Sequence, residues 1–150
     1  MSHVAFFYHI VWRTKCSEMT INPDHERLLY AYIHSMCKAR DCKLYRINSM
    51  PDHVHMLVSI SPKIAISDFM MVIKSETSKW MLSCPDKFPH FRGWGNGYAG
   101  FSYSLKDLDM IIAYIKNQKE HHRVKTFKEE YYDFLKENGM DIEHDLFLKD

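Results

Sequence analysis

The sequence predicts an α+β fold, in which helices pack on one face of a single antiparallel sheet. Short stretches rich in β-branched and aromatic residues alternate with longer stretches whose apolar residues recur at helical spacing. The predicted strands are residues 4–13, 43–48, 50–60 and a segment within 88–103. The predicted helices are residues 22–39, 66–83, 107–120 and 126–137. This order, β-α-β-β-α-β-α-α, is that of a ferredoxin-like or RRM-like sandwich.

The first three elements are expected to form the scaffold. Residues 4–13 are apolar, aromatic and β-branched, which favours a strand. Asn22 as N-cap and Pro23 in the first turn predict the start of a helix. Its buried stripe consists of apolar residues at helical spacing, Leu28, Leu29, Tyr32, Ile33 and Met36. The short strand 43–48 is expected to pair as an antiparallel hairpin with the strand that follows.

The strand at residues 50–60 carries the most informative pattern. Its apolar face is formed by Val54, Met56, Val58 and Ile60. Because successive side chains of a strand point to opposite faces, His53 and His55 lie together on the other face, about 7 Å apart at their Cα atoms. Two neutral imidazoles at this spacing can bind one metal ion, and Asp52 can orient one of them. The pair is also compatible with two half-exposed histidines that bind nothing, so a third ligand must come from elsewhere.

The next two segments offer candidate contacts to nucleic acid. In the helix at 66–83, Lys74 and Lys79 fall outside the apolar stripe and can meet phosphates, although a solvated basic face is equally compatible. Residues 88–103 are rich in aromatics and glycine, which predicts a loop and a strand with a bulge. Aromatic side chains near Arg92 and Lys106 can stack on unpaired bases, although core packing is their commoner use.

The helix at 107–120 presents two stripes. Its buried stripe is Leu108, Ile111, Ile112 and Ile115. Tyr114, Gln118 and His121 follow the same spacing on a second flank, about 100° round the helix. The alternative is a boundary tyrosine beside solvated polar residues. A last helix at 126–137, with Gly139 as its C-cap, precedes an acidic tail at 141–150.

Composition limits the classes that remain. No apolar run approaches the roughly 18 residues of a membrane span, and the N-terminus lacks the pattern of a signal peptide. The four cysteines have no zinc-binding spacing, so an intracellular chain with reduced thiols is expected. The formal net charge is only +1, so any surface that binds nucleic acid must be locally basic.

The His53-Val54-His55 strand, followed by a helix with Tyr114 and Gln118, resembles the IS200/IS605-like single-tyrosine transposases. These belong to the HUH class of nucleases, in which U is a hydrophobic residue, here Val54. The resemblance runs over about residues 4–122. It includes four stretches that look like segments of the family, residues 9–15, 50–60, 73–79 and 94–98.

The resemblance implies one HUH-type domain over residues 1–150, with a C-terminal helix and tail at 123–150. Tyr114 would attack a phosphodiester of single-stranded DNA, giving a 5′-phosphotyrosine and a free 3′-OH, and a second 3′-OH would reverse the step. His53, His55 and Gln118 would hold Mg²⁺ or Mn²⁺, and imidazole ligands favour Mn²⁺. The DNA-binding candidates are Lys74, Lys79, Arg92 and Lys106.

The resemblance also implies partners and a location. The expected ligands are single-stranded DNA hairpins at the ends of a mobile element. The expected assembly is a homodimer, in which the tyrosine helix can act in trans on the other copy. The expected location is the bacterial cytoplasm, with the nucleoid reached through DNA.

Three alternatives stay open. A domesticated nuclease of the REP-associated tyrosine type would keep the chemistry without mobility. An RRM-like binding module would bind nucleic acid without chemistry. A metal-dependent phosphoesterase that uses water would survive the loss of Tyr114.

Overall fold

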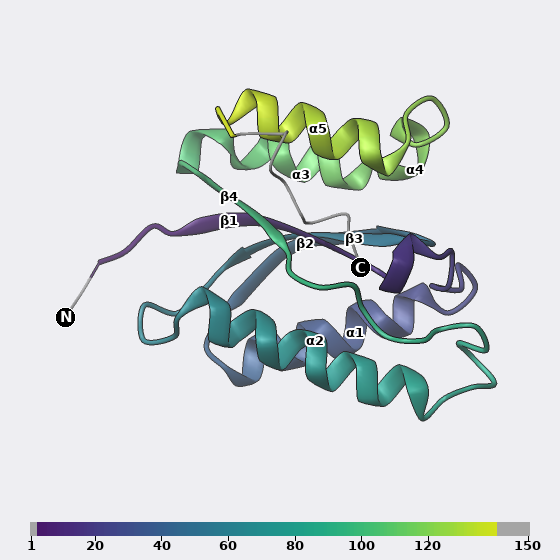
Figure 1. Ribbon diagram of the computed structural model, residues 1–150. Coiled ribbons are helices and arrows are strands. Elements are labelled where there is room, and N and C mark those ends of the chain that lie inside the picture. The colour runs from purple at the N-terminus through teal and green to yellow at the C-terminus, as the bar shows by residue number, and fades with distance from the viewer. Residues whose placement is uncertain (1–2, 141–150) are drawn as a thin grey trace.

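A four-stranded antiparallel sheet forms the centre of the molecule, with strand order β2-β3-β1-β4 (Figure 1). The computed structural model describes residues 3–140. The strands are β1 (Phe7–Arg13), β2 (Lys43–Met50), β3 (His53–Ser59) and β4 (Ala99–Tyr103). β2 and β3 pair as the predicted hairpin, and β1 lies between β3 and β4. The predicted α+β class and antiparallel sheet are confirmed.

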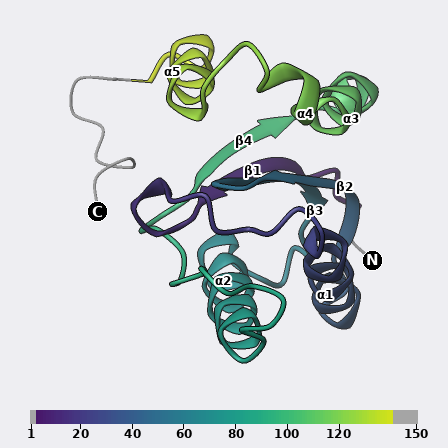
Figure 2. The same ribbon diagram turned by 90° about the vertical axis from the view of Figure 1, so that its right-hand side faces the viewer.

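Two helices cover one face of the sheet, as predicted (Figure 2). They are α1 (Glu26–Ala39) and α2 (Ile66–Leu82). The apolar face of β3 packs into this core, because Val54, Met56 and Val58 are fully buried there. α1 begins at Glu26 rather than at Pro23, since Asn22 Oδ1 accepts a hydrogen bond from the backbone of Asp24 and forms a turn first.

The opposite face, which was expected to be open, is also covered by helices (Figures 1 and 2). They are α3 (Leu108–Lys116), the short α4 (Gln118–His121) and α5 (Phe127–Glu137). The cause lies in the apolar side chains of this face. Val11 and Phe101 pack against α5, and Leu57 packs against α3. The histidines of β3 are therefore buried rather than open to solvent.

The predicted helix 107–120 is broken at Asn117, which divides α3 from α4. Two side chains hold the break against β2 and α1. Asn48 Nδ2 donates to the carbonyl of Ile115 at 2.9 Å, at the end of α3. Lys119 Nζ donates to the carbonyl of Ser49 at 2.9 Å and pairs with Glu26. Satisfying the last carbonyls of α3 from outside lets the chain turn there.

The last predicted helix is confirmed by α5 and its caps. Thr126 and Glu129 form a reciprocal capping box at its start. Gly139 has a φ of 66° and lets Met140 N bond back to the Leu135 carbonyl at 2.8 Å. The predicted tail 141–150 lies outside the described residues. In the part of the chain that the structure describes, the four cysteines form no disulfide. Within residues 3–140 no helix is long and apolar enough to cross a membrane.

Candidate active site

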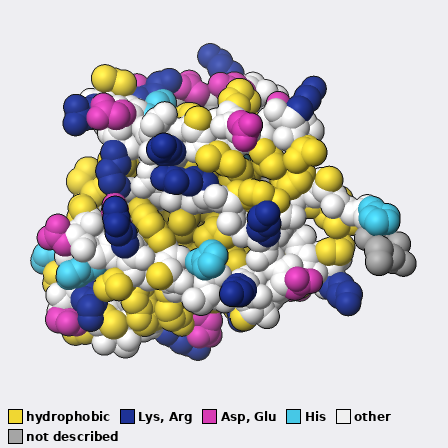
Figure 3. Space-filling model, turned by 180° about the vertical axis from the view of Figure 1, so that it is seen from behind, with side chains coloured by type: hydrophobic (Ala, Val, Ile, Leu, Met, Phe, Trp, Pro, Cys, Tyr) yellow, Lys and Arg dark blue, Asp and Glu magenta, His cyan; other side chains and the backbone are white. Residues whose placement is uncertain are grey.

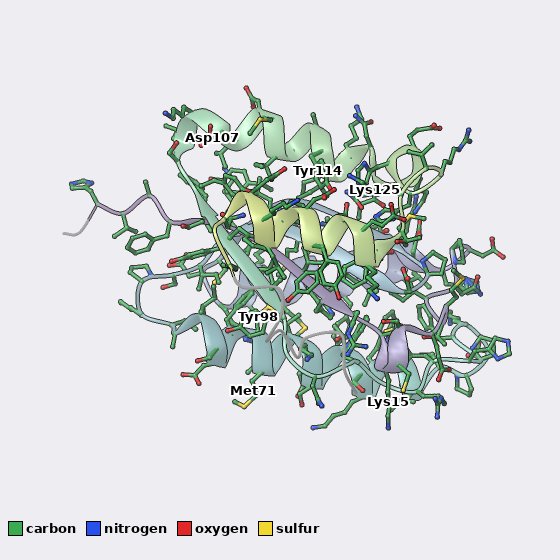
Figure 4. All side chains as sticks on the ribbon, turned by 45° about the horizontal axis from the view of Figure 1, so that its top comes forward. Lys15, Met71, Tyr98, Asp107, Tyr114 and Lys125 are labelled. Atoms are coloured by element: carbon green, nitrogen blue, oxygen red, sulfur yellow. The ribbon has the colours of Figure 1, made fainter. Side chains whose placement is uncertain are left out.

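A cluster of polar side chains is buried between the sheet and the α3–α5 layer. The carboxylate of Glu130, on α5, lies at its centre and is only 2% exposed. Figure 4 shows Tyr114 on the side of α3 that faces α5. A cavity of about 280 Å³ opens between these two helices beside Tyr114 and Glu130. The site therefore combines a solvent-reachable tyrosine with a buried polar centre.

Three imidazoles gather at one oxygen of Glu130. Oε1 lies 2.8 Å from His55 Nε2 and 3.1 Å from His122 Nε2. His53 Nε2 lies 3.5 Å from the same oxygen and 3.2 Å from His122 Nε2. The four residues form one group whose ligand atoms all lie within 4.8 Å of one another.

The second oxygen of Glu130 faces the helix that bears the tyrosine. The Tyr114 hydroxyl donates a hydrogen bond to Oε2. Gln118 Nε2 donates to the same atom at 3.2 Å, and His121 Nε2 lies 3.2 Å from it. His121 Nε2 also lies 3.3 Å from the Tyr114 hydroxyl. The predicted stripe of Tyr114, Gln118 and His121 thus converges on one carboxylate in spite of the helix break.

Each strand histidine has a partner on its other nitrogen. Asp52 Oδ1 lies 2.6 Å from His53 Nδ1, the orienting contact that the sequence predicted. His9 Nε2, from the neighbouring strand β1, lies 2.8 Å from His55 Nδ1. Such partners fix the tautomer and the orientation of an imidazole, so both Nε2 atoms are held toward the centre.

The pKa values in the cluster follow from burial and from these contacts. Burial lowers the pKa of His55 to about 4, so this imidazole is neutral near pH 7. Burial alone would raise the pKa of Glu130, but the histidines around it lower that pKa far below its ordinary value. Burial and the Glu130 charge raise the pKa of Tyr114 well above 10. The site thus holds a carboxylate beside a phenol.

The predicted ligands fit a divalent ion. His53 and His55 direct their Nε2 atoms to a common point, and Gln118 Oε1 is buried without a hydrogen-bond partner among residues 3–140. Neutral imidazoles and an amide oxygen are accepted ligands of such ions. His53, His55, Gln118 and Tyr114 therefore lie together as the sequence predicted.

Glu130, His122 and His9 also belong to this cluster, although they were not predicted from the sequence. Glu130 did leave a signal, because it lies at helical spacing with Phe127 and Phe134 on the buried stripe of α5. A charged residue on an apolar stripe must find a partner when buried. His122 follows no period, since it lies in the turn after α4.

The four predicted DNA-binding residues lie away from this cluster, and their role remains a prediction. Lys74, on α2, donates to the carbonyls of Gly95 at 2.7 Å and Gly97 at 2.9 Å, so it holds that loop. Lys79 is exposed on the same helix, and Arg92 pairs with Glu18. Lys106 is exposed just before α3. α2 lies on the opposite face of the sheet from α3, the helix that carries Tyr114 (Figure 1).

A separate groove of about 600 Å³ lies between α1 and β2. Arg27, Arg46 and Lys119 are among its lining residues. Figure 3 shows Lys and Arg side chains gathered across the face of the molecule that includes β2 and α1. None of the lysines or arginines predicted to bind DNA lines this groove.

Comparison with known proteins gives consistent matches. The family model described as "Transposase IS200 like" matches residues 2–118. The transposase of insertion sequence IS200 from Salmonella typhimurium is 26% identical over 121 residues, covering 78% of this chain and 79% of that protein. The ISDra2 transposase TnpA of Deinococcus radiodurans is 25% identical over 117 residues, covering 75% of this chain and 84% of that protein.

Two solved structures share the fold. A transposase from Deinococcus radiodurans superposes with a TM-score of 0.61 at 28% identity, covering 79% of this chain and 95% of that one. A REP-associated tyrosine transposase bound to a REP hairpin gives 0.58 at 15% identity, covering 81% and 74%. Residues His121, His122 and Glu130 all lie beyond the segment that the family model matches.

Proposed function

Since the chain belongs to the family of IS200-like transposases, we propose that it cuts and rejoins single-stranded DNA with Tyr114 as its nucleophile. One observation supports this most directly. The Tyr114 hydroxyl lies in the same buried cluster as His53 and His55 of its own chain. Nucleophile and candidate metal ligands are thus assembled within one subunit.

The proposed step balances without water or ATP. Tyr114 Oη bonds to the phosphorus, the 3′ oxygen leaves as a free hydroxyl, and the 5′ phosphate stays on the tyrosine. Attack by another 3′-OH reverses the exchange and frees Tyr114. A divalent ion held by His53, His55 and Gln118 would polarise the phosphate and favour the phenolate.

Two groups can accept the proton of the tyrosine. Glu130 Oε2 already accepts the Tyr114 hydrogen bond, and His121 Nε2 lies 3.3 Å from the hydroxyl. Burial lowers the pKa of His121, so it is a neutral acceptor near pH 7, and its side chain is 28% exposed. A base that is both neutral and open to solvent can pass the proton on to water.

The proposed ligand is hairpin DNA of an element end. It rests on the REP-associated relative, which is bound to a REP hairpin. The basic groove between α1 and β2 offers phosphate contacts through Arg27, Arg46 and Lys119.

The homodimer also remains a proposal. Tyr114 lies beside His53 and His55 of its own chain, so the site does not need a tyrosine from a second copy. An open RRM-like stacking face is not available here, because α3 and α5 cover it.

An adduct assay tests the proposal. The protein is mixed with Mn²⁺ and labelled single-stranded oligonucleotides from the DNA that flanks its gene, then run on denaturing gels. Wild type should give a denaturant-resistant protein–DNA band that Tyr114→Phe and His55→Ala lose. Tyr103→Phe is the matched control, since Tyr103 lines the same cavity and should keep the band. Cleavage that persists in Tyr114→Phe would mean hydrolysis by water and refute the tyrosine step.

A further inference from the structure

Two side chains that lie beyond the family match, those of His122 and Glu130, reach the candidate metal site. We infer that His122 Nε2 and Glu130 Oε1 are metal ligands together with His53 and His55, and that this centre binds Mn²⁺ in preference to Mg²⁺. This inference rests on the proposed function in one respect, because both place a metal ion at the same site. Both added ligands follow residue 118, where the family match ends.

The distances fit ligands of one ion. Metal bonds of about 2.1 Å place neighbouring ligand atoms roughly 3 to 3.4 Å apart. In the cluster, Oε1 of Glu130 lies 2.8 Å from His55 Nε2 and 3.1 Å from His122 Nε2. His53 Nε2 lies 3.2 Å from His122 Nε2 and 3.5 Å from Oε1. The four atoms are drawn from β3, the turn after α4, and α5, so three separate segments converge on one point.

The contacts on the Nδ1 atoms of His53 and His55 are also typical of metal-binding histidines. Asp52 binds His53 on Nδ1 at 2.6 Å, which leaves the Nε2 lone pair directed at the centre. His9 Nε2 lies 2.8 Å from His55 Nδ1 and can accept its proton when Nε2 of His55 is a ligand. The two strand ligands therefore each have an acceptor for the remaining N–H, as metal-binding histidines usually do.

The two carboxylate oxygens of Glu130 contact different groups of side chains. Oε1 faces the three imidazoles, whereas Oε2 faces Tyr114, Gln118 and His121. Glu130 would thus join the ion to the nucleophile through one carboxylate. A carboxylate that is only 2% exposed needs such neutralising partners, because an unpaired buried charge is costly.

The ligand set also determines which ion is preferred. Mg²⁺ favours oxygen ligands and retains its waters, whereas imidazole nitrogen suits first-row transition metals. Three imidazoles and one carboxylate make a nitrogen-rich set. Mn²⁺ should therefore bind this centre more tightly than Mg²⁺ does.

A titration of Mn²⁺ without DNA tests the inference. Free Mn²⁺ is followed by its electron paramagnetic resonance signal in wild type, His122→Ala and Glu130→Gln. Each variant should bind at least about tenfold more weakly, the loss expected even when only an outer partner of a ligand is removed. His90→Ala is the control, because this histidine is exposed, lies outside the cluster and should keep wild-type affinity within about twofold. A 100-fold excess of Mg²⁺ should displace little Mn²⁺ from wild type.

Wild-type affinity in both His122→Ala and Glu130→Gln would overturn the inference, as would displacement by equal Mg²⁺. Should the variants unfold, crystals of wild type soaked in Mn²⁺ decide the matter. An anomalous scattering peak within bonding distance of His122 and Glu130 supports the inference, and a peak that contacts neither refutes it. Mn²⁺ bound through these residues by a chain that forms no DNA adduct would refute the proposed function alone.

Discussion

At the scale of single residues, the hydrogen bond between Asp52 and His53 is the feature with the clearest consequence. The carboxylate accepts from Nδ1 at 2.6 Å and fixes the ring that points into the centre. Asp52→Asn keeps the shape but removes the charge that makes the imidazole a better ligand. We expect Mn²⁺ affinity to fall about 10- to 100-fold, the usual effect of losing such a partner.

Asp86→Asn is the control for this change, because Asp86 is exposed and its carboxylate pairs with Lys87. The measurement is the same Mn²⁺ titration. Equal affinity in the Asp52 variant and wild type would show that the orientation of His53 does not depend on this carboxylate.

The residues of the site divide by the kind of signal that they leave in the sequence. His53, His55, Tyr114 and Gln118 each belong to a local period of two or about 3.6 residues, so sequence alone could place them on a common face. Glu130 joins them only through the way α5 packs, and His122 only through the turn at the end of α4. Glu130 does leave a local signal, as a charged residue on the apolar stripe of α5, but contacts between distant segments have no local period, so neither residue could be assigned to this cluster from the sequence.

At the scale of elements, α5 depends on the cap at its start. Thr126 Oγ1 accepts from Glu129 N at 3.2 Å, and the Glu129 side chain returns a contact to the Thr126 backbone. Thr126→Ala should lower the free energy of unfolding by about 1 kcal/mol, within a usual range of 0.5–2 kcal/mol. Urea denaturation followed by circular dichroism measures the change.

Ser35→Ala serves as the matched control for an exposed helical hydroxyl. Ser35 donates to the Ala31 carbonyl within α1 and caps nothing, so its loss should leave stability unchanged or slightly raised. No difference between the Thr126 variant and wild type would mean that α5 is held by its apolar face alone.

The elements were predictable to different degrees. The helices α1, α2 and α5 and the strands β1 to β3 were predictable, because each shows a helical apolar period or a run of β-branched and aromatic residues, whereas β4 could be placed only within residues 88–103. The break at Asn117 was not, because its cause is Asn48 on a strand far away in the sequence. The covered second face was also missed, since Leu57, Val11 and Phe101 lie on three different strands and form an apolar surface for helices only once the sheet is assembled.

At the scale of the whole molecule, an ion at the centre should stabilise the fold. The site joins β3 to the layer of α3, α4 and α5, so binding to the native state alone opposes unfolding. Mn²⁺ at 100 times its Kd should add about 2.7 kcal/mol. For a chain of this size that corresponds to a rise in Tm of roughly 5 to 10 °C.

Differential scanning fluorimetry with Mn²⁺, and again after excess EDTA, measures this rise and its reversal. His55→Ala should show a much smaller rise. A Tm that is the same with and without Mn²⁺ would argue against any ion held between the sheet and these helices.

The position of Glu130 has a further consequence, for the gene. The family model matches only residues 2–118. The codon for Glu130, which supplies the buried carboxylate, follows that segment. A nonsense mutation between codons 118 and 130 would leave a reading frame that keeps the whole segment matched by the family model. Its product would lack both the carboxylate and the helix that covers His53 and His55. Surveys of gene copies by homology alone would count such truncated alleles as intact.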